Sequence, residues 1–420
     1  MTARHVVILG PGSAGTAAAR TLAAQGDVRT TVVGRTDEIP YSRMLVKNVA
    51  YGQAAPETVR LPRPDGELVA DTVERVDPAT REVHLASGAT IAYDALLVAT
   101  GGRPRGIDPD VAGAEQAARA GRLLTLHSLD DAVRFREAIA ARGEAARVAI
   151  YGGGLIASET ASTLQAQGHR VSLVARSRVP GVAGFGRPVA ERVAADHESR
   201  VATFFGRTVH RVLATPEATV VTLDDGSDLE VDLVVVALGT TPSAPLPWRD
   251  GVVVDDRLRA TGHGVVYAAG GVAVHHDDHL GTWRIDHWED SAAQGVHAAR
   301  TVLHDLGRGE DPGPYRPRST YMAVVHGRMI SGVGYTGHPG TRVVQSDGLV
   351  VLHEQEGAVV GVSGIEAVGE IYGWGSRLHE DLLAPSERAP RGTTKGPPPR
   401  DEEAGPSVVT AAGRGATDER

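Results

Sequence analysis

The stretch His5-Val-Val-Ile-Leu-Gly10-Pro-Gly12-Ser-Ala-Gly15 decides the fold. An apolar run that ends in glycines spaced G-x-G-x-x-G is typical of a strand that turns sharply into a helix. In such a turn the first glycine allows the tight bend, the second lets a diphosphate approach the backbone, and the third lets the helix pack closely. The amide groups at the start of the helix favour the phosphate charge. The stretch therefore predicts a dinucleotide-binding unit.

The same pattern returns about 140 residues later. The apolar run Arg147–Tyr151 leads into the turn Gly152-Gly-Gly154-Leu155-Ile156-Ala157 and then into a stretch typical of a helix, 158–167. Each copy is followed by an apolar strand with a small-residue end, at 95–101 and 233–239. One glycine turn is weak evidence, because such turns also serve packing alone, but two in the same context favour binding. We expect two dinucleotide sites.

This duplication predicts an α/β fold with two Rossmann-like dinucleotide-binding domains, the second inserted in the first, and a small C-terminal α+β domain. The expected boundaries are 1–117 with 244–314 for the first domain, 118–243 for the second and 315–384 for the C-terminal domain.

The last part of the chain has two different patterns. Alternating apolar positions over Met322 to Val333, Val343–Leu352 and Ala358–Val362 predict strands, which a final helix follows. From 385 to 420 Pro, Gly, Arg and Glu dominate, and we expect a disordered tail.

The composition excludes several classes of function. The chain contains no cysteine, which removes redox-active disulfides, iron–sulfur ligation through cysteine and zinc ribbons. Its net charge of −9 argues against a general nucleic-acid binder. The first residues run into an apolar strand without the features of a signal peptide, and no stretch approaches the roughly 20 apolar residues that span a bilayer. We therefore expect a cytoplasmic protein without a membrane or nucleic-acid partner.

Taken in order, the motifs over about residues 5 to 380 resemble those of the two-dinucleotide-binding flavoproteins, the FAD-dependent pyridine nucleotide oxidoreductases. The resemblance is to the ferredoxin- and rubredoxin-reductase-like enzymes and to the flavin domain of nitrite reductases, without redox cysteines. It is carried by Ile39-Pro-Tyr41-Ser-Arg43, Leu97-Val-Ala-Thr100-Gly101-Gly-Arg103-Pro, Val236-Ala-Leu-Gly239-Thr-Thr-Pro242, Tyr267-Ala-Ala-Gly270, Asp286-His-Trp288 with Ala293-Gln294-Gly295, and Ser319-Thr320 with Ser331-Gly332-Val333-Gly334.

The resemblance implies a FAD-dependent NAD(P)H oxidoreductase. In such enzymes the reduced nicotinamide gives a hydride to flavin N5, and the electrons pass to a ferredoxin- or rubredoxin-type iron–sulfur protein or to a small-molecule substrate. Whether the chain forms a homodimer stays open. The cofactor-binding residues expected at matching positions are Gly10, Gly12, Ser13, Ala14, Gly15, Arg35, Arg43, Thr100, Gly101, Arg103, Gly152, Gly154, Leu155, Ile156, Glu159, Ala175, Arg176, Arg178, Gly239, Gly270, Gly271 and Trp288.

Two positions of the first site depart from the family pattern. Arg35 stands where an acid holds the adenosine ribose of FAD; Asp37 could take that role, although an ordinary loop carboxylate is the simpler interpretation. Gly271 replaces the aspartate of Y-A-A-G-D, which in the family bonds the ribityl chain. At roughly 1.5–3 kcal/mol for each hydrogen bond to a charged group, the two losses predict weaker FAD binding or an altered site.

The catalytic candidates are Glu159 and Lys47. In the family a glutamate at the position of Glu159 lies near the nicotinamide and pairs with a lysine, but Asn48 stands at the lysine position and Lys47 is one residue early. One residue turns a side chain by about 100° on a helix, so the sequence does not establish the pair. A first-turn acid favoured by the helix dipole is the equal alternative for Glu159. For Trp288, a flavin-side aromatic and a buried core residue are equal alternatives.

His275, His276 and His279, with Asp277 and Asp278, lack the spacing of a closed metal site. We interpret the segment as a solvated loop and expect no metal. Compensation for Gly271 by Asp277 or Asp278 is the other role considered, because the family's segment passes near the flavin.

The second site is predicted to prefer NADPH over NADH. Its second strand ends in Ala175-Arg176-Ser-Arg178, where an NAD enzyme carries an acid for the ribose hydroxyls. A neutral residue followed by arginines suits a 2′-phosphate, which arginine binds bidentately. The alternative is that an arginine-rich chain places arginines in loops by chance.

Two further functions stay open. The losses at Arg35 and Gly271 also fit a degenerate flavoprotein that acts as a binding or scaffold subunit. A redox enzyme of specialised metabolism that acts on a small substrate would use the same cofactors.

Overall fold

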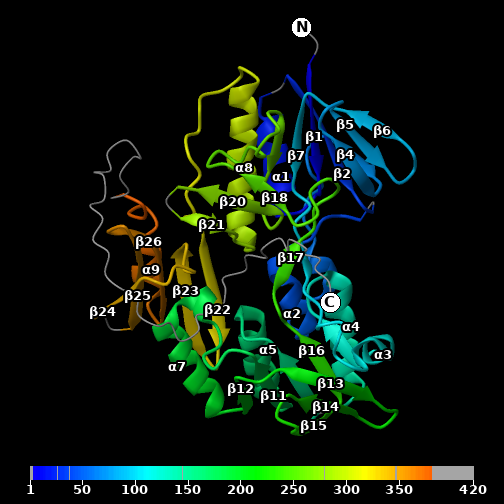
Figure 1. Cartoon of the computed structure of the whole chain (residues 1–420), viewed down its shortest axis with the longest axis vertical. Helices are drawn as coiled ribbons and strands as arrows, with labels where there is room; N and C mark the ends of the chain where they lie inside the picture. Colours follow the sequence, from blue (N-terminus) through cyan, green and yellow to red (C-terminus); the bar gives the residue numbers. More distant parts are fainter. Residues whose placement is uncertain are drawn as a thin grey trace, which may run out of the picture. The chain divides into compact units, whose positions relative to one another are not determined.

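A computed structural model describes residues 3–380, apart from 26, 37, 144, 279 and 346–347 (Figure 1). The predictions made for Asp37, His279 and the tail 385–420 therefore lie outside the described residues.

The first domain is built on a parallel sheet with the order β19-β7-β1-β2-β3. Strand β1 is a continuous apolar run, fully buried from Val6 to Leu9, as expected of a central parallel strand. It pairs with β2 on one side and with β7 on the other. The chain therefore leaves β1 in one direction and returns on its other side, which creates a topological switch point where nucleotides bind. The strands are β1 (Arg4–Leu9), β2 (Val28–Gly34), β3 (Glu67–Ala70), β7 (Ala95–Val98) and β19 (Val266–Ala268).

Helices α1 (Ser13–Ala23) and α8 (Trp288–Asp305) lie side by side on this sheet (Figure 1). Their backbones approach so closely that a side chain at Gly295 would collide with the Ala14 carbonyl oxygen. The small residues on the buried face of α1, among them Ala18 and Ala19, are thus required by helix packing.

The second domain repeats this plan in a parallel sheet with the order β12-β11-β10-β16-β9. Strand β10 lies between β11 and β16 as β1 lies between β2 and β7. The strands are β9 (Leu123–Thr125), β10 (Arg147–Tyr151), β11 (Arg170–Ala175), β12 (Ala202–Phe205) and β16 (Leu233–Val236). The helices are α3 (Ala114–Arg119), α4 (Leu129–Ala140), α5 (Leu155–Ala166), α6 (Val182–Phe185) and α7 (Arg187–Glu198). Helix α3, which includes the expected boundary residue 117, packs on the β13 strand of this domain.

Each domain also carries a three-stranded antiparallel sheet inserted before its last parallel strands. In the first domain it is β4 (Val73–Asp77), β5 (Glu82–Leu85) and β6 (Thr90–Ala92); in the second it is β13 (Val209–Ala214), β14 (Thr219–Leu223) and β15 (Asp228–Val231). Strands β8 (Gly102–Pro104) and β17 (Thr240–Pro242) pair antiparallel, so the two segments that connect the domains run together. A further sheet joins β18 (Val252–Val254), β20 (Ala273–Asp277) and β21 (Gly281–Trp283).

The first domain also sends a short helical segment onto the second. It consists of η1 (Arg43–Leu45), α2 (Val46–Ala50) and η2 (Pro56–Val59). Val46, Val49 and Ala50 are buried in the same cluster as Leu129 and Phe135 of α4. Helix α2 is therefore held against the second domain by apolar packing.

The C-terminal domain is an antiparallel sheet with the order β22-β23-β26-β25-β24, followed by α9 (Val368–Gly373). The strands are β22 (Thr320–Val325), β23 (Arg328–Gly334), β24 (Thr341–Gln345), β25 (Leu349–Gln355) and β26 (Ala358–Ile365). The apolar stretch Val343–Leu352 belongs to two antiparallel strands, because alternation alone does not reveal where a hairpin turns. The predicted fold class is confirmed.

Candidate functional site

Both glycine turns lie at the carboxyl ends of central parallel strands. A side chain at Gly10 would meet the Ala99 carbonyl oxygen, and one at Gly152 would meet the Ala237 carbonyl oxygen. Gly10 also has a φ of +102°, which favours glycine. At the third position a side chain at Gly15 would collide with the Gly10 carbonyl oxygen, whereas the second turn accepts a buried alanine, Ala157.

The second glycine of each turn faces open space. A side chain at Gly12 or at Gly154 would have no heavy atom within 4 Å. These two residues are the N-caps of α1 and α5, and neither helix has an acid in its first turn. Unpaired amides and free space at a helix start suit a diphosphate, so both turns fit a dinucleotide.

Thr100 gives a second sign of a ligand at the first turn. Its hydroxyl oxygen is buried and has no hydrogen-bond partner among the described residues. Its Cα lies 3.1 Å from the position that a Cβ at Gly10 would take. A buried hydroxyl without a partner is costly, and a ligand at the turn would supply one.

Lys47 and Glu159 form an ion pair between the first and second domains. Lys47 Nζ donates to Glu159 Oε1 at 2.6 Å and to Oε2 at 2.7 Å. The Glu159 side chain is only 7% exposed. Burial raises the pKa of its carboxyl, while the Lys47 ammonium and the Val324 backbone amide act in the opposite direction. The carboxylate is therefore in contact with α2, α5 and β22.

The sequence did not establish that Lys47, one residue early, would pair with Glu159; in the structure the two side chains do pair. The 3₁₀ turn η1 precedes α2, and the rotation per residue in a 3₁₀ turn differs from that in an α-helix. The direction of the Lys47 side chain therefore cannot be extrapolated from Arg43 with α-helical spacing. Tyr51 fixes the helix further: its hydroxyl lies 2.7 Å from the Thr160 hydroxyl on α5.

Arg43 of the first domain contacts His127 of the second. Arg43 Nη1 lies 2.9 Å from His127 Nδ1. Burial, and after it the Arg43 charge, lower the pKa of His127 to about 4, and the charges of Asp286 and Arg35 also act on it. Arg35 is exposed directly after β2 and has no ion pair among the described residues. The sequence analysis missed His127; its place just before the Ser128 capping box of α4 was the only available signal.

The end of β11 presents the residues predicted to read the second nucleotide. Ala175 is buried, while Arg176 and Arg178 are exposed and form no ion pair with any residue described in the structure. The Arg178 stem lies against Gly206, where a side chain would come within 3.1 Å of its Cγ. Two unpaired guanidinium groups thus follow a strand end that carries no acid.

The carboxylate beside Gly271 is Asp286, a residue for which the sequence analysis had no role beyond its motif. Asp286 accepts hydrogen bonds from Arg284, which no motif contained, and from Thr240, which belonged to a quoted motif but had no role. The suggestion of Asp277 or Asp278 rested on nearness in sequence, whereas Asp286 reaches this point from the segment before α8. Arg284 is equally hard to find from sequence, because its partners are Thr240 of β17 and Gly271 between β19 and β20.

The His275 segment is not a solvated loop, as the sequence analysis had interpreted it. It forms β20, and the His275 ring is 2% exposed and stacks on Trp283 with ring centroids 3.7 Å apart. Two-residue alternation places His275 inward and His276 outward. Among the described residues, no group of three or more histidines and acids is placed to hold a metal.

Trp288 is half-buried at the start of α8, so it is not a buried core residue. Its carbonyl oxygen accepts a hydrogen bond from Ser13 Oγ at 2.8 Å, which ties α8 to the first turn. Ala14 is buried and Leu155 and Ile156 are half-buried beside their turns. Gly101, Gly239 and Gly270 have positive φ values, and Arg103 Nε donates to Thr241 Oγ1 at 3.3 Å.

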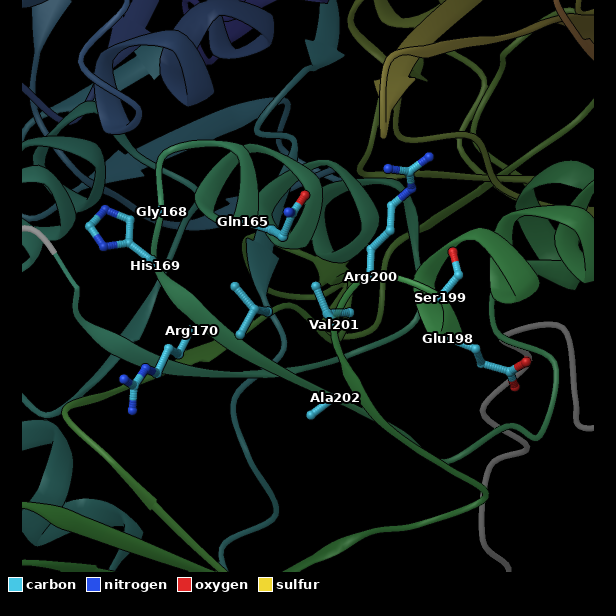
Figure 2. Close-up of a pocket in the computed structure, with 10 residues that line it drawn as sticks. Gln165, Gly168, His169, Arg170, Glu198, Ser199, Arg200, Val201 and Ala202 are labelled. Carbon is cyan, nitrogen blue, oxygen red and sulfur yellow. The ribbon is translucent and has the colours of Figure 1, made fainter.

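An open hollow of about 630 Å³ lies elsewhere on the second domain (Figure 2). Its lining comes from the carboxyl ends of α5 and α7 and the amino ends of β11 and β12, and the side chains of Arg170, Glu198 and Arg200 point in different directions. Ligands of parallel α/β sheets bind at the carboxyl ends of the strands, so this hollow is not a nucleotide site. No helix in the described part of the chain is long and apolar enough to cross a membrane.

Comparison with known proteins gives a consistent result. The family model described as pyridine nucleotide-disulphide oxidoreductase matches residues 4–295. The biphenyl dioxygenase system ferredoxin–NAD(+) reductase component of Paraburkholderia xenovorans (strain LB400) is 28% identical over 393 residues, 87% of this chain and 90% of that protein. The NADH-dependent phenylglyoxylate dehydrogenase subunit epsilon of Aromatoleum evansii is 30% identical over 255 residues; the match spans 57% of this chain and only 58% of that protein.

Solved structures share the fold. The covalent putidaredoxin reductase–putidaredoxin complex gives a TM-score of 0.76 at 25% identity, covering 90% of this chain and 93% of that one. An engineered water-forming NADPH oxidase bound to NADPH gives a TM-score of 0.74 at 20% identity, covering 91% and 94%.

Proposed function

The chain belongs to the pyridine nucleotide-disulphide oxidoreductase family, as a ferredoxin reductase-like, FAD-dependent pyridine nucleotide oxidoreductase, and on this premise we propose that it oxidises NADPH and reduces a small redox protein. The observation that carries the proposal is the Lys47–Glu159 ion pair. It joins a segment of the first domain to the helix that begins at the second glycine turn. On this proposal the pair would lie where the nicotinamide and the flavin meet.

The residues of the first domain would hold FAD, and those of the second would hold NADPH. When bound, FAD accepts a hydride from the reduced nicotinamide and passes electrons on one at a time. The amides of α1 and the Arg43 guanidinium would compensate the diphosphate charge of FAD. Glu159, held by Lys47, would orient the nicotinamide beside α5. The remaining cofactor-site residues named from the sequence are proposed in the same roles.

The preference for NADPH is proposed from the residues after β11. An acid at Ala175 would repel a 2′-phosphate, and the chain has none there. The engineered oxidase bound to NADPH is described as carrying aspartate-to-alanine, alanine-to-arginine and methionine-to-serine changes at three successive positions. This chain has the same three residues in the same order, Ala175-Arg176-Ser177. The proposed preference rests on the charge and the bidentate geometry of arginine.

A protein acceptor is proposed on two grounds. The chain has no cysteine, so no disulfide of its own relays electrons from the flavin. The reductase from Paraburkholderia is named for a ferredoxin partner, and the putidaredoxin reductase structure contains its redox protein. We therefore place a ferredoxin- or rubredoxin-type protein ahead of a small-molecule substrate.

Anaerobic titration of the purified protein tests the proposal. We expect a yellow protein whose flavin absorbance is bleached by NADPH at least about tenfold faster than by NADH at equal concentration. Reduced protein should then reduce an added ferredoxin. A colourless protein that stays colourless with added FAD would overturn the proposal and support a scaffold subunit, while equal rates with both nucleotides would overturn the NADPH preference alone.

A further inference from the structure

The position of Gly271 is occupied by the carboxylate of another residue. A Cβ built at Gly271 would collide with Asp286 Oδ1 and would lie 3.0 Å from its Cγ. Gly271 follows the end of β19, and Asp286 lies in the segment before α8. The space that a side chain at 271 would fill therefore contains a carboxyl group that arrives from fifteen residues further along the chain.

A half-buried arginine, Arg284, holds this carboxylate in place. Arg284 Nε donates to the Gly271 carbonyl oxygen at 2.7 Å, and its Nη2 donates to Thr240 Oγ1 at 2.8 Å and to Asp286 Oδ2 at 3.2 Å. Thr240 Oγ1 also donates to Asp286 Oδ2. The Arg284 side chain is only 16% exposed, so this network links three segments in a fixed geometry.

One oxygen of Asp286 is left for a ligand. Among the described residues, every hydrogen bond to Asp286 ends on Oδ2, and Oδ1 accepts none. A carboxylate oxygen has two acceptor sites, and the Asp286 side chain is 32% exposed. Oδ1 thus points into the place of the missing 271 side chain as a free acceptor.

This acceptor lies beside the first glycine turn. A Cβ at Gly270, the neighbour of Gly271, would come within 3.3 Å of Ala14 Cβ on α1. The backbone there is fixed, because Gly270 N donates to the buried Gln294 side chain at 2.7 Å. The charge of Asp286 also acts to raise the pKa of His127, which contacts Arg43.

We propose that Asp286 binds a hydroxyl group of FAD through Oδ1, with Arg284 as the positioning residue, and that glycine at 271 is required to make room for it. In this chain residue 286, and not residue 271 as in the family pattern, would supply the carboxylate of the first site. The proposal rests on FAD binding at the first glycine turn. It explains why the loss of a side chain at Gly271 does not leave the site without an acceptor.

Exchange of the two residues tests the proposal by measuring the dissociation constant of FAD for the apoprotein from flavin fluorescence. Asp286→Ala should raise the constant about tenfold or more, the size expected for a lost hydrogen bond to a charged group. Gly271→Asp alone should raise it similarly, because the new side chain meets Asp286. The double variant Gly271→Asp with Asp286→Gly should return it to within about threefold of the wild type.

Two controls separate ligand binding from a structural role. Asp278→Ala removes an exposed carboxylate from the neighbouring segment and should leave the constant unchanged. The double variant restores a carboxylate at the site but not the contacts of Asp286 with Thr240 and Arg284, so a merely structural role predicts no rescue. Absence of rescue, or wild-type affinity in Asp286→Ala, would overturn the proposal, while a wild-type chain that binds no FAD would overturn the proposed function with it.

Discussion

The two glycine turns share their backbone and differ in the side chains around them. Gly10 and Gly152 lie against carbonyl oxygens of the neighbouring strand in the same way, and Gly12 and Gly154 leave the same open space. Around the first turn, however, the charged groups come from distant segments: Asp286 before α8, and Arg43 with His127. Around the second turn the distinguishing residues are adjacent in sequence: Ala175 ends β11, and Arg176 and Arg178 follow it. On the proposed assignment, the backbone of each turn accommodates a dinucleotide and the surrounding side chains select which one.

The largest expected effect is the loss of nucleotide binding at one turn while binding at the other turn is kept. Gly12 and Gly154 have φ values of −73° and −90°, so a side chain at either residue costs the backbone little. A glutamate there would place a negative charge against the diphosphate. Gly12→Glu should weaken FAD binding at least about 100-fold and spare NADPH binding, and Gly154→Glu should do the reverse. Flavin content and NADPH fluorescence titrations measure the two effects, with the melting temperature of the apoprotein as the control for folding.

Loss of both nucleotides in either variant would show that the two sites are not independent. An unchanged affinity would contradict the assignment of the diphosphate to that turn.

The next effect concerns the nucleotide preference of the second site. Ala175→Glu with Arg176→Ala should lower kcat/KM for NADPH about 30-fold or more and favour NADH, because an acid repels the 2′-phosphate and binds ribose hydroxyls. Steady-state kinetics with both nucleotides measure the ratio. The matched control is Arg170→Ala, an exposed arginine at the other end of β11. If the control changes the ratio as much, general charge rather than a specific contact sets the preference.

Sequence reasoning reached the backbone features of this comparison because they are local. A strand, a glycine turn and a helix are encoded within about fifteen residues, and their spacing follows from strand and helix geometry. The same reasoning predicted the fold class, and it expected the second strand of the second unit to end near Ala175, which is the last residue of β11.

It did not establish contacts that depend on the packing of distant segments. Whether Lys47 reaches Glu159 depends on how the 3₁₀ turn at Arg43 sets the phase of α2. That Asp286 fills the place beside Gly271 depends on how β17, β19 and the start of α8 meet. The strand at His275 was equally hard to predict, because the apolar and polar residues of Val274-His275-His276 do not alternate and His275 is buried by stacking on Trp283.

A smaller effect tests the ion pair between the domains through its pH dependence. Burial raises the pKa of Glu159 above its ordinary value of 4.5, so the unfolded chain releases this proton at lower pH than the folded one. The free energy of unfolding therefore falls as pH rises from about 4.5 through the raised pKa. Lys47 limits this fall. Lys47→Met should cost about 1–3 kcal/mol at pH 8 and clearly less at pH 5, as measured by urea denaturation.

The double variant Lys47→Met with Glu159→Gln supplies the control, since it has no carboxyl at residue 159 to titrate. Its stability relative to the wild type should vary less between pH 5 and pH 8 than that of Lys47→Met. An equal loss at both pH values in the single variant would mean that Lys47 acts through packing and not through its charge.

The smallest effect tests whether Arg35 acts on the first nucleotide through its charge alone, unlike the arginines of the second site, which are proposed to bind a phosphate directly. Arg35 is exposed and acts on His127 only through its charge, so its contribution to FAD binding should be electrostatic and screened by salt. Arg35→Ala should raise the dissociation constant of FAD about two- to fivefold at low ionic strength. The difference should shrink in roughly 0.5 M salt, where the Debye length is only a few Å. Arg192→Ala, an exposed arginine of α7, should change nothing. A loss that persists in high salt would instead indicate a direct hydrogen bond from Arg35 to FAD, and tighter binding would mean that the arginine opposes the cofactor.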